Sequence, residues 1–277
     1  MAVAPWRTGS AEPRPSVPVP PGRMALLRGG RPLKRWHYVG CFTGSVMLCV
    51  ASARIGPLPV SWWAVWDREQ RTLAENTVRG RSVVAYEEDR LRVQDGPVAI
   101  DLRVGAAAAV ETISPHGPQY AWTRKQGGVP ITGTVTLGDR RHEVDGAGVV
   151  DESAGYHARR TAWRWSAGVG TLADGRPAAW NLVTGLHDAR EASERTVWAG
   201  GTPHQVGPVA FDGLEAIAFE EGGRLEFTAE ATRTHEENLG LLASSYDQPF
   251  GTFAGELPGA GRLREGYGVM ERHDVKW

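Results

Sequence analysis

Short runs in which apolar and polar residues alternate, separated by pairs of turn-forming residues, constrain the fold of this chain most. In residues 98–104, VAIDLRV, apolar side chains recur at every second position, the spacing of an extended strand with one buried face. Residues 224–230, RLEFTAE, repeat the pattern. The pattern predicts an all-β, antiparallel, meander-like protein of roughly twenty strands. The turn pairs that separate such runs are Asp95-Gly96, Asp174-Gly175, Gly200-Gly201 and Gly222-Gly223.

About twenty strands are too many for one small barrel, which closes with roughly eight to ten. We therefore expect two tandem antiparallel barrels or half-barrels. The Gly-rich stretch 127–148 lies near the middle of the folded part of the chain. We place the domain boundary there, with an N-terminal barrel-like domain over 24–140 and a C-terminal one over 141–277.

The first 23 residues contain six prolines and no apolar core. This composition predicts a disordered, proline-rich tail over 1–23 and not a secretory signal. The two cysteines, Cys41 and Cys49, fall on opposite faces of a hairpin that turns at Thr43-Gly44, so they cannot form a disulfide. We expect a cytoplasmic protein with reduced thiols.

Charge and motifs argue against several functions. The net charge is −1, which leaves no basic footprint for a nucleic-acid partner, and no run approaches the ~20 apolar residues of an integral membrane helix. The Gly-x-Gly sequences at 168–170 and 259–261 lack the third glycine of a nucleotide-binding loop. The eight histidines include no His-x-x-x-His pair. We expect no cofactor and no metal site.

The stretch 151–170, DESAGYHARRTAWRWSAGVG, combines tryptophans with charged residues. A two-residue turn at Asp174-Gly175 would pair it with residues 176–188 and bring its tryptophans onto one face with those of the partner strand. We predict that these indoles line the interior of a barrel and that an ion pair lies towards one end of the pocket. The predicted ligand-binding residues on this face are Trp163, Trp165, Trp180 and Arg159, with Arg159 paired to Asp188 and with His157 nearby.

Each of these groups also has a plainer interpretation. The Arg159–Asp188 pair can be a structural latch, the tryptophans can be ordinary core, and His157 can be a hydrogen-bonded structural group. If the site is catalytic, the candidates for proton transfer are Asp151, Asp188 and His157. Residues 270–277, MERHDVKW, alternate as well, so they predict a terminal strand that closes a barrel.

Three long segments resemble an uncharacterised family, domain of unknown function 2804. They are VVDESAGYHARRTAWRWSAGVG at 149–170, LKRWHYVGCFTGSVMLCVASARIGPLP at 33–59, and an ending that contains QPFGTFAGEL and GYGVMERHDVKW. The resemblance spans about residues 25–277, and it implies no particular activity.

A shorter pattern is similar to the Gly-Asp-x-Gly-x-Arg-x-Trp signature of tandem lipocalin-like proteins, which include carotenoid 1,2-hydratase, AttH-type proteins and tocopherol cyclase. This resemblance implies two calycin-like barrels and a lipophilic, often isoprenoid, ligand. The chain has Glu152-Ser153-Ala154 where the signature usually has an aromatic residue before its second glycine. The residues that carry the pattern are Gly148, Asp151, Gly155, Arg159, Trp163 and Trp165.

Three functions follow as alternatives. The chain can bind or carry an apolar small molecule in a Trp-lined cavity, with Arg159 holding a polar head group. It can be a hydratase, cyclase or isomerase, in which Asp151 or Asp188 protonates a double bond and the indoles of Trp163 and Trp165 shelter the cation. It can also be a structural or interaction module with a filled core. The sequence identifies neither the ligand nor a protein partner.

Overall fold

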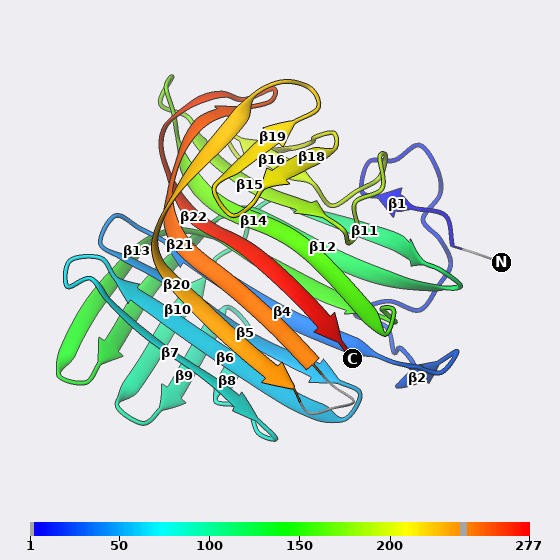
Figure 1. The fold of residues 1–277 in the computed structure, drawn as a ribbon, viewed down its shortest axis with the longest axis horizontal. Coiled ribbons are helices and arrows are strands. Elements are labelled where there is room, and N and C mark those ends of the chain that lie inside the picture. The colour runs from blue at the N-terminus through cyan, green and yellow to red at the C-terminus, as the bar shows by residue number, and fades with distance from the viewer. Residues whose placement is uncertain (1–2, 239–242) are drawn as a thin grey trace.

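A computed structural model describes residues 3–238 and 243–277 (Figure 1). Within these residues every regular element is a β-strand, so the all-β expectation is confirmed. The described part of the chain has no helix of the length and apolarity that a membrane crossing requires. The strands form two large antiparallel sheets in tandem, barrel-like in the first and a half-barrel in the second, and one small hairpin, β2 (Leu27–Arg28) with β3 (Arg31–Pro32).

The first sheet has the order β7-β6-β5-β4-β13-β12-β10-β9-β8, and β12 also pairs with β11, which pairs with β1. Its strands are β1 (Trp6–Arg7), β4 (Lys34–Phe42), β5 (Val46–Ile55), β6 (Leu58–Asp67), β7 (Thr72–Arg79), β8 (Val84–Glu87), β9 (Arg90–Asp95), β10 (Val98–Val104), β11 (Ala109–His116), β12 (Gln119–Leu137) and β13 (Arg140–Gly155).

The second sheet has the order β17-β16-β15-β14-β22-β21-β20-β19-β18. Its strands are β14 (Arg160–Leu172), β15 (Pro177–Thr184), β16 (Thr196–Ala199), β17 (Thr202–Gln205), β18 (Val209–Asp212), β19 (Ala216–Phe219), β20 (Arg224–Asn238), β21 (Ala243–Leu257) and β22 (Gly261–Lys276). The alternating C-terminal segment is indeed a strand, and it lies in the middle of this sheet between β14 and β21.

The chain changes from one sheet to the other between Gly155 and Arg160. The expected boundary at residue 140 therefore falls at the β12–β13 turn, inside the first sheet. The Gly-rich composition of 127–148 has a different origin: Gly133 and Gly148 sit where an added Cβ would meet the backbone of a neighbouring strand, at 2.1 Å from Asp101 O and 1.9 Å from Gly40 O.

The β14–β15 turn differs from the prediction by one residue. The Leu172 amide bonds the Arg176 carbonyl, which leaves a three-residue connection, 173–175, and Gly175 has the positive φ of +89° that such turns require. Trp165 therefore pairs with Val183, and Gly168 pairs with Trp180. Since side chains alternate along a strand, this shift moves all of β15 to the opposite face relative to the prediction.

The β4–β5 turn is also displaced, but with a different consequence. Cys41 pairs with Leu48, and Gly40 pairs with Cys49, so the register is offset by two residues from the expected one. An offset of two leaves every side chain on its predicted face. Both cysteines are buried and free, one on each face of the sheet.

Most of residues 3–23, the segment expected to be disordered, are exposed, and the segment contacts the rest of the protein at a few positions. The Arg7 guanidinium donates to the Ser193 carbonyl at 2.6 Å and to Thr196 Oγ1 at 3.0 Å, and Val19 lies in a small aromatic-rich cluster. The surface of the sheets supplies most of the apolar area in these contacts, so the segment needs few apolar residues of its own.

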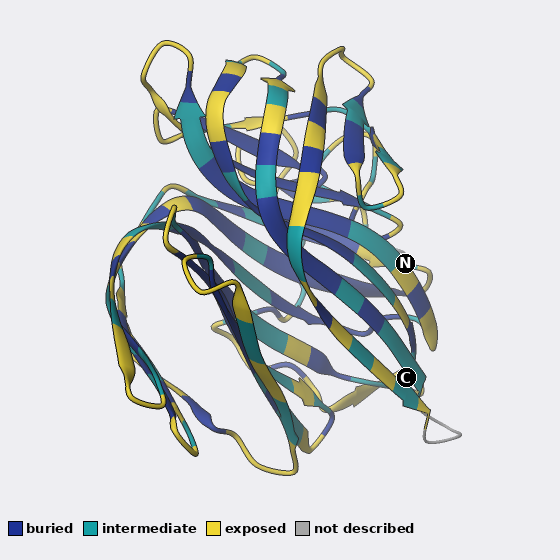
Figure 2. Cartoon of the chain, turned by 60° about the vertical axis from the view of Figure 1, so that its left-hand side comes forward, coloured by how far each residue is buried: buried dark blue, intermediate teal, exposed yellow. Residues whose placement is uncertain are grey.

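Besides this small cluster, three large apolar clusters divide the molecule. One fills the concave side of the first sheet, the second fills that of the second sheet, and the third lies between the two sheets. In Figure 1, β20–β22 pass over β4–β6, and Figure 2 shows buried residues concentrated where the sheets meet. The space between the sheets is therefore a separate compartment, bounded by the outer faces of both.

A β-bulge at Glu230 fixes how the second sheet meets the first. Ala229 pairs with Gly251 and Ala231 pairs with Phe250, so Glu230 is the extra residue. Its carboxylate accepts bonds from Arg68 at 2.6 and 2.7 Å and from Trp66 Nε1 at 2.9 Å, on the first sheet.

Candidate active site

A cavity of about 440 Å³ lies between the two sheets. This volume is within the usual range of small-molecule sites. Strands β4–β7 supply one wall, and β14 and β20–β22 supply the other. Its aromatic lining residues are Trp36, Tyr38, Trp62, Trp163, Trp165, Tyr246 and Trp277.

The predicted tryptophans separate into two groups. Trp163 and Trp165 line this cavity, as expected of ligand-binding candidates, but the cavity is not the interior of a barrel. Trp180 lies on the other face, in the core of the second sheet, where its Nε1 donates to Ser166 Oγ at 3.1 Å. The prediction that all three indoles share one wall is wrong because it assumed a two-residue turn at Asp174-Gly175.

Glu271 of β22 is the acidic group that most resembles a catalytic acid. Its side chain is buried in the cavity wall, and burial raises the pKa of its carboxyl group to about 7. Trp163 Nε1 donates to Oε1 at 2.7 Å, and Gln248 Nε2 donates to Oε2 at 2.8 Å, which opposes part of that rise and fixes the orientation of the carboxyl group. A carboxyl group with this pKa can both give and take a proton near neutral pH.

Asp151 also faces the cavity, but in a different electrostatic state. Its Oδ1 lies 2.5 Å from Nζ of Lys125, which is buried, and Trp36 Nε1 donates to Oδ2 at 3.4 Å. The same lysine lies 3.2 Å from Glu194, whose pKa is raised by burial. One buried ammonium thus pairs with two carboxyl groups, and the negative charge of Asp151 adds to the rise in the pKa of Glu271.

Two predicted site residues lie outside the cavity. Arg159 and Asp188 are both exposed, and neither borders the cavity. Within the described residues they form no ion pair with each other. Asp188 instead accepts the Gly185 amide at 2.7 Å and stabilises the turn after β15. The one-residue shift of β15 removes the contact on which the Arg159–Asp188 prediction rested.

His157 is buried beside the cavity, under the ring of Trp36 at 5.1 Å between centroids. It lies in the connection between the two sheets, and His187 approaches it with an Nε2–Nε2 distance of 3.5 Å. The expected register placed His187 on the opposite face, but His187 follows the end of β15 at Thr184 and has a positive φ of 52°, so strand alternation does not set its direction.

Sequence reasoning missed Glu271, Lys125 and Glu194 as site residues. A signal for Glu271 existed: alternation in 270–277 places it on one face with Val275 and Trp277, and all three line the cavity. Lys125 and Glu194 had none, because each is an ordinary charged residue until long-range pairing buries it.

Two solved structures share the architecture. An AttH-like protein from Nitrosomonas europaea aligns with 92% of this chain and 98% of its own, at 14% identity and a TM-score of 0.57. A kievitone hydratase from Nectria haematococca aligns with 86% of this chain and 88% of its own, at 12% identity and a TM-score of 0.54. At these identities the likeness concerns the fold alone, and it confirms the lipocalin-like tandem architecture.

A search of curated protein sequences gives no match. A scan against protein-family models does give one, over residues 83–277, a shorter range than the expected 25–277. The match covers more than half of the chain, so the protein belongs to the family described as Domain of unknown function (DUF2804).

Proposed function

We propose that the cavity binds an apolar, unsaturated small molecule and that Glu271 catalyses proton transfer to a carbon–carbon double bond of that ligand. The observation that carries the proposal is the position of Glu271, a carboxylic acid with a pKa near 7 that borders the cavity together with Trp163 and Tyr246. Burying such a group costs stability, and strongly shifted pKa values of this kind are concentrated at functional sites.

The hydrogen bonds of Glu271 leave room for this chemistry. Trp163 and Gln248 each donate to a different carboxyl oxygen, and the Tyr246 hydroxyl also interacts with the group, so at least one of the four lone-pair sites stays free. One of these sites holds the proton in the neutral form. Both donors remain bonded when the proton leaves, which stabilises the carboxylate that results.

The reaction balances without a further reagent. The alkene π electrons form a C–H bond with the Glu271 proton, and the adjacent carbon becomes a cation. Loss of a neighbouring C–H proton to the Glu271 carboxylate gives a shifted double bond, and addition of water followed by loss of its proton gives an alcohol. The faces of Trp163, Trp165 and Trp36 attract a cation, as aromatic rings do.

Asp151 serves this site in another way. As the partner of Lys125 it offers a negative charge and not a proton, so its field favours both the neutral form of Glu271 and a nearby carbocation. The kievitone hydratase, a structural relative, is a hydratase by description, which supports the same class of reaction here.

Solvent deuterium tests the proposal directly. Farnesol, geranylgeraniol and linoleic acid are first screened by quenching of tryptophan fluorescence. Each ligand that binds is then incubated with the protein in D2O and analysed by mass spectrometry. We expect deuterium at an alkene carbon of at least one ligand, lost in Glu271→Gln and retained in Asp274→Asn, an exposed acid of the same strand. Tight binding without exchange would identify a carrier instead, and no binding by any probe would contradict the apolar ligand.

A further inference from the structure

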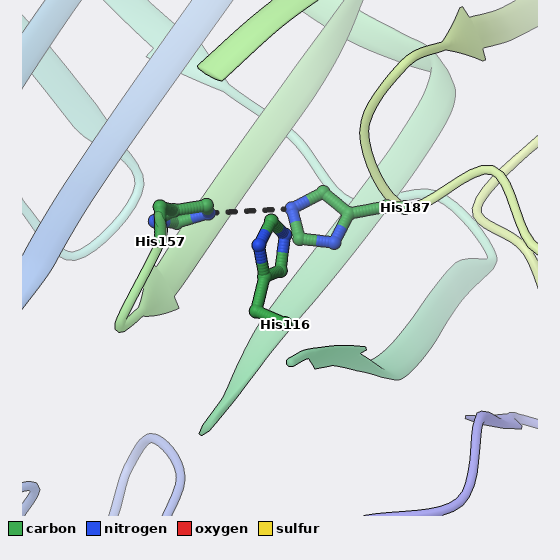
Figure 3. Close-up of side chains that lie close together, drawn as sticks. All are labelled: His116, His157 and His187. Carbon is green, nitrogen blue, oxygen red and sulfur yellow. Dashed lines mark hydrogen bonds between the residues drawn. The ribbon is translucent and has the colours of Figure 1, made fainter. Parts of the chain in front are cut away.

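Three histidines that are far apart in the sequence converge beside the cavity (Figure 3). His116 ends β11, His157 lies in the connection between the sheets, and His187 lies in the connection from β15 to β16. His157 and His187 are buried, and His116 is half-buried. No pair of them is closer than 30 residues in the chain, so a search for closely spaced ligands could not detect the cluster.

The separation of the ring nitrogens suits a small metal ion. One ligand nitrogen from each ring lies within 4.8 Å of the other two, and His157 Nε2 is 3.5 Å from His187 Nε2. Tetrahedral zinc with Zn–N bonds of about 2.05 Å separates its nitrogen ligands by about 3.4 Å. The His157–His187 pair already has this separation, and His116 reaches it by a small inward movement.

The cluster also has a ring nitrogen that the protein leaves without a partner. Nδ1 of His187 is buried and has no hydrogen-bond partner among the described residues. Buried polar atoms normally have a partner, so this nitrogen points to a ligand that the protein itself does not supply.

We propose that His116, His157 and His187 bind one Zn²⁺ ion, which ties the connection between the sheets to the end of β11 and to the loop after β15. Each ligand comes from a different segment, so the ion would cross-link the two halves of the molecule. This site is distinct from Glu271 and does not depend on its role.

Two nearby positive charges affect which fourth ligand the zinc ion would bind and how tightly the site would hold the ion. Lys34 Nζ donates to the His157 carbonyl at 3.1 Å, and Arg31 donates to the His116 carbonyl at 2.8 Å. Both cations disfavour a bare dication, so the fourth ligand is expected to be an anion, such as hydroxide or a carboxylate. For the same reason the affinity should be weaker than that of a cysteine-rich zinc site.

Equilibrium dialysis of chelator-treated full-length protein against zinc sulfate, followed by metal analysis, tests the site. We expect one zinc per chain and a melting temperature that rises by about 5 °C at a hundredfold excess of zinc over the dissociation constant. His157→Gln should weaken binding at least about tenfold, as losses at metal sites typically do. Cobalt, used in place of zinc, should give the intense visible absorption of a tetrahedral site.

His204→Gln is the matched control because His204 is exposed on β17, and it should bind zinc like the wild type. Circular dichroism verifies that each variant is folded, and His116→Gln replaces His157→Gln if the latter is not. Absence of stoichiometric zinc, or equal binding by the wild type and a folded ligand variant, would overturn the proposal. Unchanged zinc binding in Glu271→Gln would show that the site stands whether or not the proposed reaction does.

Discussion

The concave cores of the two sheets and the space between the sheets are built from opposite faces of the same strands. In β4, Val39 and Cys41 point into the core of the first sheet, while Trp36 and Tyr38 point into the cavity. The core of the first sheet is almost entirely valine, leucine and isoleucine. The cavity instead gathers indoles, phenols and buried charges. The core face of these strands therefore stabilises the fold, and the cavity face can provide functional groups.

Truncating one tryptophan in each compartment tests whether the core and the cavity wall contribute differently to stability. Trp180→Ala removes a fully buried ring from the core of the second sheet and should cost about 3–5 kcal/mol of unfolding free energy. Trp163→Ala, in the cavity wall, should cost only about 1–3 kcal/mol, because its ring already faces a void. Urea denaturation measures both values. Equal losses would show that the cavity wall is as important for stability as the core.

Glu271 should make the stability of the cavity depend on pH. Its pKa is raised to about 7 in the folded protein, from 4.5 in the unfolded chain. Above pH 4.5 the unfolded chain loses the proton first, so the folded state becomes progressively less stable up to about pH 7. Glu271→Gln removes this penalty, and we expect it to be stabilised relative to the wild type by about 3 kcal/mol more at pH 8 than at pH 4. Urea titrations at the two pH values provide the measurement. A pH-independent difference would mean that folding does not raise the pKa of Glu271.

His273 should act in the opposite direction. Its ring lies 4.3 Å from that of Trp163, and burial lowers its pKa from 6.5 to about 3. As the pH falls below 6.5, His273 binds a proton in the unfolded chain but stays neutral in the folded protein. The free energy of unfolding therefore falls. Between pH 6.5 and pH 5 the loss is about 2 kcal/mol. His273→Gln should be less sensitive to acid by that amount, and a curve parallel to that of the wild type would contradict this assignment.

Arg159 should give the smallest effect. Because it is exposed and lies outside the cavity, Arg159→Ala should change stability by no more than about 0.5 kcal/mol and leave fluorescence quenching by farnesol unchanged. Weaker quenching would restore Arg159 as a head-group ligand and place part of the ligand outside the cavity.

The sequence supports the fold better than it supports the site, and turn geometry explains the difference. Period-2 alternation and glycine pairs identify strands such as 98–104 correctly because both signals are local. One extra residue in the turn that ends at Gly175 reversed the faces of β15, and with them the position of Trp180. A site between two sheets depends on the registers of many strand pairs at once. An error in one register therefore assigns some of its residues to the wrong face.

The buried polar groups were out of reach for a second reason. His116 and His187 belong to segments that meet only after both sheets have formed, and Lys125 is indistinguishable in sequence from a solvated lysine. Glu271 was the exception: its strand was predicted, and its neighbours Val275 and Trp277 shared the expected face. Local alternation shows which residues share a face of the strand. It does not show which face of the sheet borders a cavity.

The bulge at Glu230 carries a consequence for how the family can vary. Before it, Leu225 and Phe227 point into the core of the second sheet; after it, Arg233 and His235 point into the cavity. A strand of the same length without the bulge would turn its second half over and place the Arg233 guanidinium among the phenylalanines. A homologue that lacks the bulge should therefore also be one residue shorter at this position, so that both halves of the strand keep their faces.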